Sequence, residues 1–240
     1  MLNTGFDSGT ENILFFGDPN LGEEGFGLFE GFFPNVKRLI WKKGTDKTEA
    51  RKNLHSQSGL FTVSFYNDFI FSRDDFDFLG LPLNLHPSLP SLRGIGYDHL
   101  PLIENHEEHG VTLHFLNRLS HHKLDIRRDV DSGRIIRARK RTLSPDTTYG
   151  HIRRLNQQIA LEMLAELCEQ MLAWGCVETA RRELNAEADE NNLVWAERYV
   201  DSSTLQKMLE ELKTSDPDHR VFVKEPVLYS NKEPSLNGLF

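Results

Sequence analysis

The sequence has few cysteines and no long apolar run. No apolar stretch among its 240 residues approaches the roughly 18 residues that a membrane-spanning helix needs, so we expect no membrane span. The two cysteines, Cys168 and Cys176, are too few for a disulfide framework and do not form a metal-ligand pattern. The first residues, Met1–Glu11, lack a basic start followed by an apolar run. We therefore expect no secretory signal and a cytoplasmic location.

Positive charge is also in short supply. The formal net charge is -8 and the sequence pI is about 5.7. A chain of this charge is poorly suited to hold a large polyanion such as tRNA or DNA. The densest basic segment, Arg134–Arg141, is compatible with two interpretations, a solvated or strand-edge charge run and a surface that faces a phosphate.

The common phosphate-binding fingerprints GxGxxG and GxxxxGK[ST] are both absent. The stretch 18–31 contains four glycines, but its apolar residues fit a short helix packed on a sheet. Hydrophobic residues make up 38% of the chain and charged residues 27%, which is ordinary for a folded globular protein. The glycines alone are therefore weak evidence for nucleotide binding.

Short apolar segments alternate with polar or amphipathic ones along the first part of the chain. The segments predicted to be strands are Asn12–Gly17, Val36–Trp41, Leu60–Phe71, Leu79–His86, Val111–Leu116 and Arg134–Leu143. The last two could pair as a long hairpin, and a helix is expected over Tyr97–Glu104. Alternation of strands and helices with short connections predicts an α/β protein with an open, mostly parallel sheet. In such sheets ligands gather at the carboxyl ends of the strands.

The second part of the chain begins with an amphipathic pattern over Gly150–Trp174, which predicts a long helix that covers one face of the sheet. Beyond Thr179 the chain is strongly polar, and a further helix is expected near Ser203–Leu212. We expect a catalytic domain over 1–148. The remainder, 149–240, is expected to be a small helical or mixed appendage.

The segment from Asn84 to Gly96 carries candidate chemistry, and its sequence is NLHPSLPSLRGIG. In a strand, Asn84 and His86 project to the same face and can contact one ligand. Pro87 stops the strand and places the imidazole at its end, where reactive groups are reachable.

Asp131 precedes Gly133 on a turn within VDSGRII, and a hairpin could bring it over the Asn84 and His86 pair. A carboxylate beside a histidine favours the imidazolium. An imidazolium and a carboxamide N–H together stabilise a developing oxyanion. Acyl transfer to an amine needs such a site and a base that collects the amine proton.

These motifs, with HGVTLHF between them at His109–Phe115, resemble the folate-dependent formyltransferase family in sequence and in order. The resemblance covers roughly Asn12–Leu143 and implies a Rossmann-like fold, N10-formyltetrahydrofolate as co-substrate and no metal. It also implies that Asn84, His86 and Asp131 form the catalytic trio. His86 would hold the tetrahedral oxyanion, Asn84 would donate to the formyl oxygen, and Asp131 would orient or charge His86 and relay the amine proton.

The resemblance also suggests residues that bind the two substrates. The loop expected around the pterin ring, mainly through backbone contacts, contains Ser64, Phe65, Tyr66, Asn67, Asp68, Phe69 and Ile70. Residues expected to contact the acceptor are Arg93, Gly94 and Tyr97, with Arg93 a candidate for a phosphate or carboxylate. Thr112 and His114 are expected to pack against or orient their neighbours, with direct substrate contact as the alternative.

The sequence departs from the family pattern between His114 and Asp131, where it has about ten more residues than members of the family usually carry. Asp129 is therefore an alternative to Asp131, and Asp125 a weaker one. The extra residues could form a longer hairpin that contacts the acceptor or a second subunit. Two loose clusters of histidines, at 106–109 and 121–122, do not offer a convincing set of metal ligands.

Among formyltransferases, the segment RGIGYDHLPLIENHEEHGVTLHF is most similar to the sugar N-formyltransferases, which act on nucleotide-linked amino sugars in polysaccharide biosynthesis. The acidic charge disfavours a tRNA acceptor, and 17–25 lacks the Ser-Asn-Leu signature of glycinamide ribonucleotide transformylases. A glycinamide ribonucleotide or other amine formyltransferase, a hydrolase that releases formate, and a binding module without activity remain alternatives. A homodimer formed through the carboxyl-terminal elements is expected.

Overall fold

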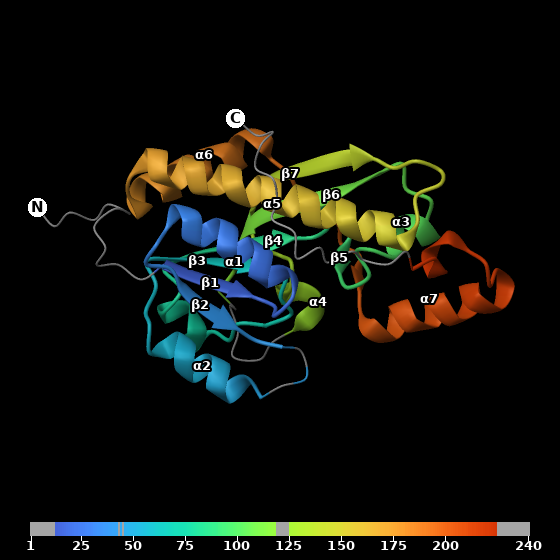
Figure 1. The fold of residues 1–240 in the computed structure, drawn as a ribbon, viewed down its shortest axis with the longest axis horizontal. Coiled ribbons are helices and arrows are strands. Elements are labelled where there is room, and N and C mark those ends of the chain that lie inside the picture. The colour runs from blue at the N-terminus through green and yellow to red at the C-terminus, as the bar shows by residue number, and fades with distance from the viewer. Residues whose placement is uncertain (1–12, 43, 45, 119–124, 225–240) are drawn as a thin grey trace, which may run out of the picture.

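A six-stranded mixed sheet forms the centre of the molecule (Figure 1) in a computed structural model that describes residues 13–42, 44, 46–118 and 125–224. The strand order is β2-β1-β3-β4-β6-β7. The parallel strands are β1 (Ile13–Gly17), β2 (Lys37–Ile40), β3 (Phe61–Phe65) and β4 (Leu81–His86), and the antiparallel ones are β6 (Glu108–Phe115) and β7 (Ile135–Thr142). The open, mostly parallel α/β sheet predicted from the sequence is confirmed.

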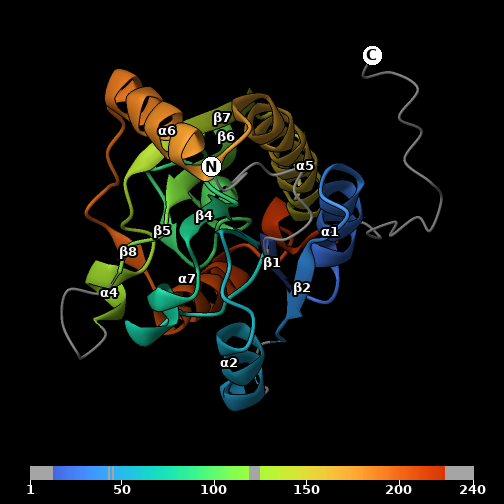
Figure 2. The same cartoon turned by 90° about the vertical axis from the view of Figure 1, so that its left-hand side faces the viewer.

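Helices cover both faces of this sheet (Figures 1 and 2). One face is covered by α1 (Leu21–Phe32), α5 (Tyr149–Trp174) and α6 (Val177–Asn191), and the other by α2 (Lys47–His55). Successive side chains of β1 alternate between the two cores: Ile13 and Phe15 pack under α1, while Leu14 and Phe16 pack toward α2. A strand buried on both faces is continuously apolar, as β1 is.

The same alternation orients β4. Leu81, Leu83 and Leu85 face the core under α5, so Asn84 and His86 share the opposite face, as predicted. Pro87 cannot donate to a ladder, and the strand ends at His86. The two polar side chains therefore lie at the carboxyl edge of the parallel strands.

The basic segment on β7 is a contact within the chain. Arg137 and Arg139 pair in register with Leu113 and Val111, whose side chains lie in the core under α5 and α6. The guanidiniums of Arg137, Arg139 and Arg141 bind carboxylates on these two helices: Glu187, Glu166 and Glu162. The interpretation of this segment as a phosphate-facing surface is therefore wrong.

The carboxyl-terminal part contains more structure than the sequence predicted. The helix α6 was not predicted, because its composition is polar. Its buried positions form a narrow stripe of four residues, and two of these are alanines. After α6 the chain forms β8 (Tyr199–Val200), which pairs in parallel with β5 (Arg93–Gly94) in a separate two-stranded sheet. The helix α7 (Ser202–Ser215) and the 3-10 turn η2 (Arg220–Phe222) follow, where the sequence had predicted a helix near 203–212.

Short elements complete the connections: η1 (Asp74–Asp77), α3 (Leu100–Ile103) and α4 (Ile126–Asp129). Ten residues of the long helix α5 are buried within the chain, against α1, β6 and α6, so its apolar face is covered here. Residues on both sides of position 148 therefore share one core. Within the described ranges, no helix is both long and apolar enough to cross a membrane.

Candidate active site

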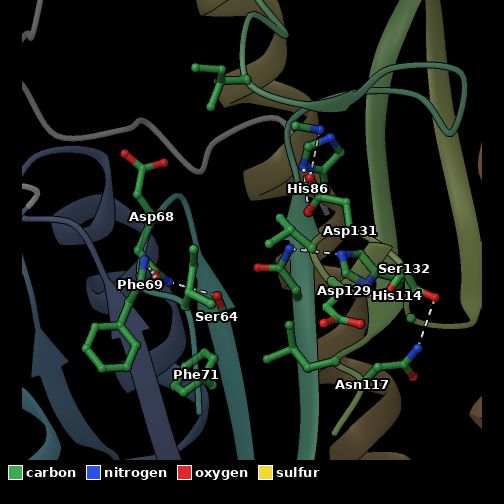
Figure 3. Close-up of a pocket in the computed structure, with 18 of the residues that line it drawn as sticks. Ser64, Asp68, Phe69, Phe71, His86, His114, Asn117, Asp129, Asp131 and Ser132 are labelled. Atoms are coloured by element: carbon green, nitrogen blue, oxygen red, sulfur yellow. Dashed lines mark hydrogen bonds and ion pairs between the residues drawn. The ribbon is translucent and has the colours of Figure 1, made fainter. Parts of the chain in front are cut away.

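A cavity of about 480 Å³ opens at the carboxyl ends of β3 and β4 (Figure 3). The loop after β3 forms one side, with Asp68, Phe69 and Phe71. The ends of β4 and β6 and the turn before β7 form the other, with His86, His114 and Asp131. The size is that of a small-molecule site. Its position matches the edge at which ligands bind to open α/β sheets.

His86 is 4% exposed, and a polar atom faces each of its ring nitrogens. Its Nε2 lies 3.0 Å from the carbonyl oxygen of Leu92, which can only accept, so Nε2 carries a proton. Its Nδ1 lies 3.4 Å from Oδ1 of Asp131. The Asp131 carboxylate therefore lies beside the ring nitrogen that Leu92 leaves free.

Asp131 reaches this position from a strained turn. Its φ is +46°, in the left-handed region that few residues other than glycine adopt. The carboxylate is anchored at Oδ2, which accepts from the backbone N–H of Gly94 at 3.0 Å, and Oδ1 is left on the side of His86. The alternative, Asp129, also borders the cavity, but its carboxylate is ion-paired with Arg128. The structure brings Asp131 to His86.

Asn84 is oriented by a second histidine. Nδ1 of His114 lies 2.8 Å from the carbonyl oxygen of Phe115, so Nδ1 carries the proton and Nε2 accepts. Burial lowers the pKa of His114 to about 4, so the ring is neutral near pH 7. Nδ2 of Asn84, 2.9 Å from Nε2, therefore donates to it, which fixes the orientation of the carboxamide. His114 orients its neighbour, as expected.

The loop after β3 is fixed by a network around Asn67. Its Nδ2 donates to the carbonyl oxygen of Phe16 and to Oγ of Ser64, and its Oδ1 accepts from the backbone N–H of Phe69. Six of the seven residues predicted to surround a pterin ring border the cavity: Ser64, Tyr66, Asn67, Asp68, Phe69 and Ile70. The side chain of the seventh, Phe65, is fully buried in the core under α1 because it points to the opposite face of β3.

The cavity has an aromatic end near α2. Trp41, Phe69 and Phe71 line it, and Nζ of Lys47 lies 5.4 Å and 5.5 Å from the ring centroids of Trp41 and Phe69. Burial lowers the pKa of Lys47. This end can hold a flat ring.

Arg93 does not line the cavity, and the expectation that it binds an acceptor phosphate or carboxylate is not supported by its contacts. Its guanidinium is almost fully buried and donates to backbone carbonyl oxygens of residues 127, 128, 130, 131 and 196. Several of these carbonyls belong to the turn that presents Asp131, so Arg93 holds that turn. Gly94 and Tyr97, the other residues expected at the acceptor, do border the cavity.

The contribution of the chain beyond α6 to the cavity was not predicted from the sequence. Tyr199, Asp201 and Ser202 line the cavity because β8 pairs with β5 beside the Asp131 turn. Hydrogen bonds from Thr204 lower the pKa of Asp201, which is therefore ionised. The sequence held no signal for this, since a two-residue strand in a polar segment has no detectable period.

Among the described residues, no group of three or more histidine, cysteine, aspartate or glutamate side chains could hold a metal ion. His106 contacts Glu104, and His109 is buried against Asn156. His121 and His122, the other histidine cluster considered from the sequence, lie outside the described residues.

No protein-family model and no curated protein matches the chain. Solved structures do match its fold. The formyltransferase PseJ from Anoxybacillus kamchatkensis, in complex with UDP-4,6-dideoxy-4-formamido-L-AltNAc and tetrahydrofolate, has a TM-score of 0.56 and 20% identity over 87% of this chain and 95% of its own.

The N-formyltransferase from Helicobacter canadensis, in complex with folinic acid and dTDP-3-aminofucose, has a TM-score of 0.53 and 17% identity over 67% of this chain. The match spans 64% of that protein, which is less than two thirds of its length. Glycinamide ribonucleotide transformylase 1 from Geobacillus kaustophilus has a TM-score of 0.51 and 15% identity over 68% of this chain and 98% of its own. At these identities the likeness establishes the shared Rossmann-like fold.

Proposed function

We propose that this chain transfers a formyl group from N10-formyltetrahydrofolate to the amino group of a nucleotide-linked deoxyamino sugar. The observation that carries the proposal is the convergence of Asn84, His86 and Asp131 on one cavity at the carboxyl edge of the sheet. These side chains come from β4 and from the turn before β7. Solved structures of this fold support the assignment, since two of them hold a folate together with a nucleotide sugar or its formylated product.

The folate is proposed to bind between the loop after β3 and the aromatic end of the cavity. The network around Asn67 presents the backbone of residues 66–70 to the cavity, and a pterin needs backbone donors and acceptors at its edge. The rings of Phe69 and Phe71 offer flat apolar contacts. These features fit a large heteroaromatic ligand.

Asn84, His86 and Asp131 are proposed to carry the chemistry. Asn84 has one N–H engaged with His114, and the second can donate to the formyl oxygen. An imidazolium at His86 stabilises the negative charge that develops on that oxygen as the amine attacks the formyl carbon. Asp131 Oδ1 accepts the proton that the amine nitrogen loses and passes it on to N10, so that the bond between the formyl carbon and N10 breaks and tetrahydrofolate leaves with an N10–H.

The acceptor is proposed to enter beside Asp131 and Asp201, both of which border the cavity. Carboxylates draw a protonated amine toward the reacting centre, and an amine is the group to be formylated. Tyr97 and Tyr199 lie on the same border and can pack against a sugar ring.

The test is acceptor-dependent conversion of N10-formyltetrahydrofolate to tetrahydrofolate, followed by absorbance. The panel holds amino-sugar nucleotides, glycinamide ribonucleotide and a sample without acceptor. Turnover with an amino-sugar nucleotide is expected. Turnover with glycinamide ribonucleotide alone, or formate release without any acceptor, would instead establish the transformylase or the hydrolase.

The same assay tests the proposed residues. His86→Asn and Asn84→Ala should each lower kcat by orders of magnitude, since each removes a group that meets the developing charge. The matched controls are His106→Asn and Asn53→Ala, which change partly exposed or exposed side chains that do not border the cavity and should leave kcat unchanged. Near-normal turnover in His86→Asn and Asn84→Ala would contradict the assignment.

A homodimer, a cytoplasmic location and a role in polysaccharide biosynthesis are also proposed, on the resemblance to sugar N-formyltransferases. Light scattering on the full chain at several concentrations tests the dimer. A single species with the mass of one chain at every concentration would contradict it.

A further inference from the structure

Trp195 lies behind the candidate trio and contacts both of the site's histidines. The centroid of its ring system is 5.7 Å from that of His86 and 5.0 Å from that of His114, at interplanar angles of 76° and 88°. Its Nε1–H donates to the carbonyl oxygen of Gly133 at 2.6 Å. One side chain thus touches β4, β6 and the turn that carries Asp131.

The segment around Trp195 is tied to the site on both sides. The backbone N–H of Ala196 donates to the carbonyl oxygen of Pro90, and its carbonyl oxygen accepts from Arg93. A few residues later β8 pairs with β5, and Ile95 donates to Val200. The same Arg93 holds the turn of Asp131. The indole is therefore fixed by backbone contacts that do not depend on a ligand.

We propose that Trp195 is a positioning residue that holds the imidazoles of His86 and His114 in their working planes. This inference rests on the proposed function. Trp195 does not border the cavity, whereas both histidines do, so it acts through them and does not touch the substrates.

The polar contacts of the two histidines do not prevent the imidazole rings from tilting out of their planes, and packing of the indole does. Each imidazole has a polar contact at both of its nitrogens: three are hydrogen bonds, and the fourth is the 3.4 Å contact between His86 Nδ1 and Asp131 Oδ1. The N–H groups and lone pairs of an imidazole lie in the plane of its ring. Such contacts resist rotation within the plane more than tilting out of it. The indole packs close to perpendicular to both rings and blocks this tilt. Tilting His114 would also turn the carboxamide of Asn84.

The experiment compares Trp195→Ala and Trp195→Phe with the wild type and with Trp174→Phe as the matched control. Trp174 ends α5 and does not border the cavity. Trp195→Ala should lower kcat by roughly 10- to 100-fold while the KM values change little, because the groups are misplaced and not removed. Trp195→Phe keeps a ring and should recover most of kcat. A Trp195→Ala enzyme with wild-type kcat, or one changed only in KM, would overturn the proposal.

Ring-proton NMR signals of the histidines give a readout that does not depend on turnover. Loss of the indole ring current by itself moves the signals of His86 and His114 in Trp195→Ala, so the readout is their width: these signals should broaden, while those of His55 and His151, on other parts of the chain, should keep their width. If the wild type transfers no formyl group, the proposed function fails while these signals still decide the role of Trp195. Signals of His86 and His114 as sharp as in the wild type would overturn it, and equal broadening of all four signals would show general loosening, which also overturns it.

Discussion

Asp131 and Tyr66 are two of the four described non-glycine residues with positive φ, and both border the cavity. Backbone strain of this kind costs on the order of 1–3 kcal/mol and persists only where surrounding contacts enforce it. At Asp131 the enforcing contacts are visible: Arg93 binds its carbonyl oxygen and Gly94 binds its carboxylate. The strain places one carboxylate oxygen beside His86.

Asp131→Asn should lower kcat by roughly 100-fold or more, because the amide neither accepts the amine proton nor stabilises the imidazolium. Asparagine tolerates the left-handed conformation, so the fold should be kept. Steady-state kinetics measure the change, and circular dichroism checks the fold. Asp129→Asn is the matched control, since its carboxylate pairs with Arg128, and it should cost far less. Loss of activity in Asp129→Asn alone would show that the roles are reversed.

The positions of individual site residues could be predicted from the sequence where the residues share one strand. Asn84 and His86 were predicted to lie on the same face because the period of a strand requires it, and the structure confirms that placement. Arg93 was misinterpreted because its partners are backbone carbonyls on a turn and on the segment after α6. No local pattern encodes such a contact.

At the scale of elements, the pairing of β5 with β8 connects the carboxyl-terminal part to the site. The pairing requires close backbone approach at Gly94, whose φ is +86°. A Cβ there would lie 2.2 Å from the carbonyl oxygen of Val200. The long helix α5 was predicted from the repeat of its apolar residues. The helix α6 and the strand β8 were not, because the apolar stripe of α6 is narrow and β8 has only two residues, so neither shows a clear repeat of apolar positions.

Gly94→Ala should lower the free energy of unfolding by on the order of 1–3 kcal/mol, from backbone strain and the clash with Val200. It should also lower kcat, because Gly94 anchors Asp131 and β8 carries the segment of Trp195 toward the site. Urea unfolding and steady-state kinetics measure both effects.

Gly27→Ala is the control for this substitution. No atom lies within 4 Å of a Cβ at Gly27, which is in α1, so alanine should be neutral or stabilise by up to about 1 kcal/mol. Equal stability of the Gly94→Ala and wild-type proteins would contradict the role of this close approach.

At the scale of the whole molecule, the fold buries two neutral histidines. Burial lowers the pKa of His109 to about 3 and that of His114 to about 4. The open, mostly parallel sheet was predicted from the alternation of apolar and polar segments, but its strand order and this burial were not. It depends on the antiparallel strand β6, which is covered by α5 on one face and carries His114 into the site on the other.

The free energy of unfolding should fall as the pH drops from about 6.5 to about 4. In this range the unfolded chain protonates His109, His114 and the half-buried His99, whose pKa burial also lowers to about 4, while the folded chain does not. Each costs up to about 1.4 kcal/mol per pH unit. Asp98 opposes this trend between about pH 4 and pH 6, because burial raises its pKa to about 6. In that range the folded chain binds the proton of Asp98 more tightly than the unfolded chain, so acidification stabilises the fold through this group. Urea unfolding across this range checks the sign.

His109→Gln should make this pH dependence shallower by about one proton. Exposed histidines such as His151 keep access to water and provide the control, so His151→Gln should leave the slope unchanged. Stability that is flat or rises on acidification would contradict the burial of neutral imidazoles.

The pairing of β5 with β8 joins positions about a hundred residues apart in the chain. On the ribosome, β1 to β7 and the residues of the trio emerge well before this partner does. The nascent chain can thus form its sheet and place His86 and His114 while Tyr199 is still missing from the cavity and Trp195 is still missing behind the two histidines. The proposed activity would then appear late in synthesis, once β8 has emerged and paired with β5.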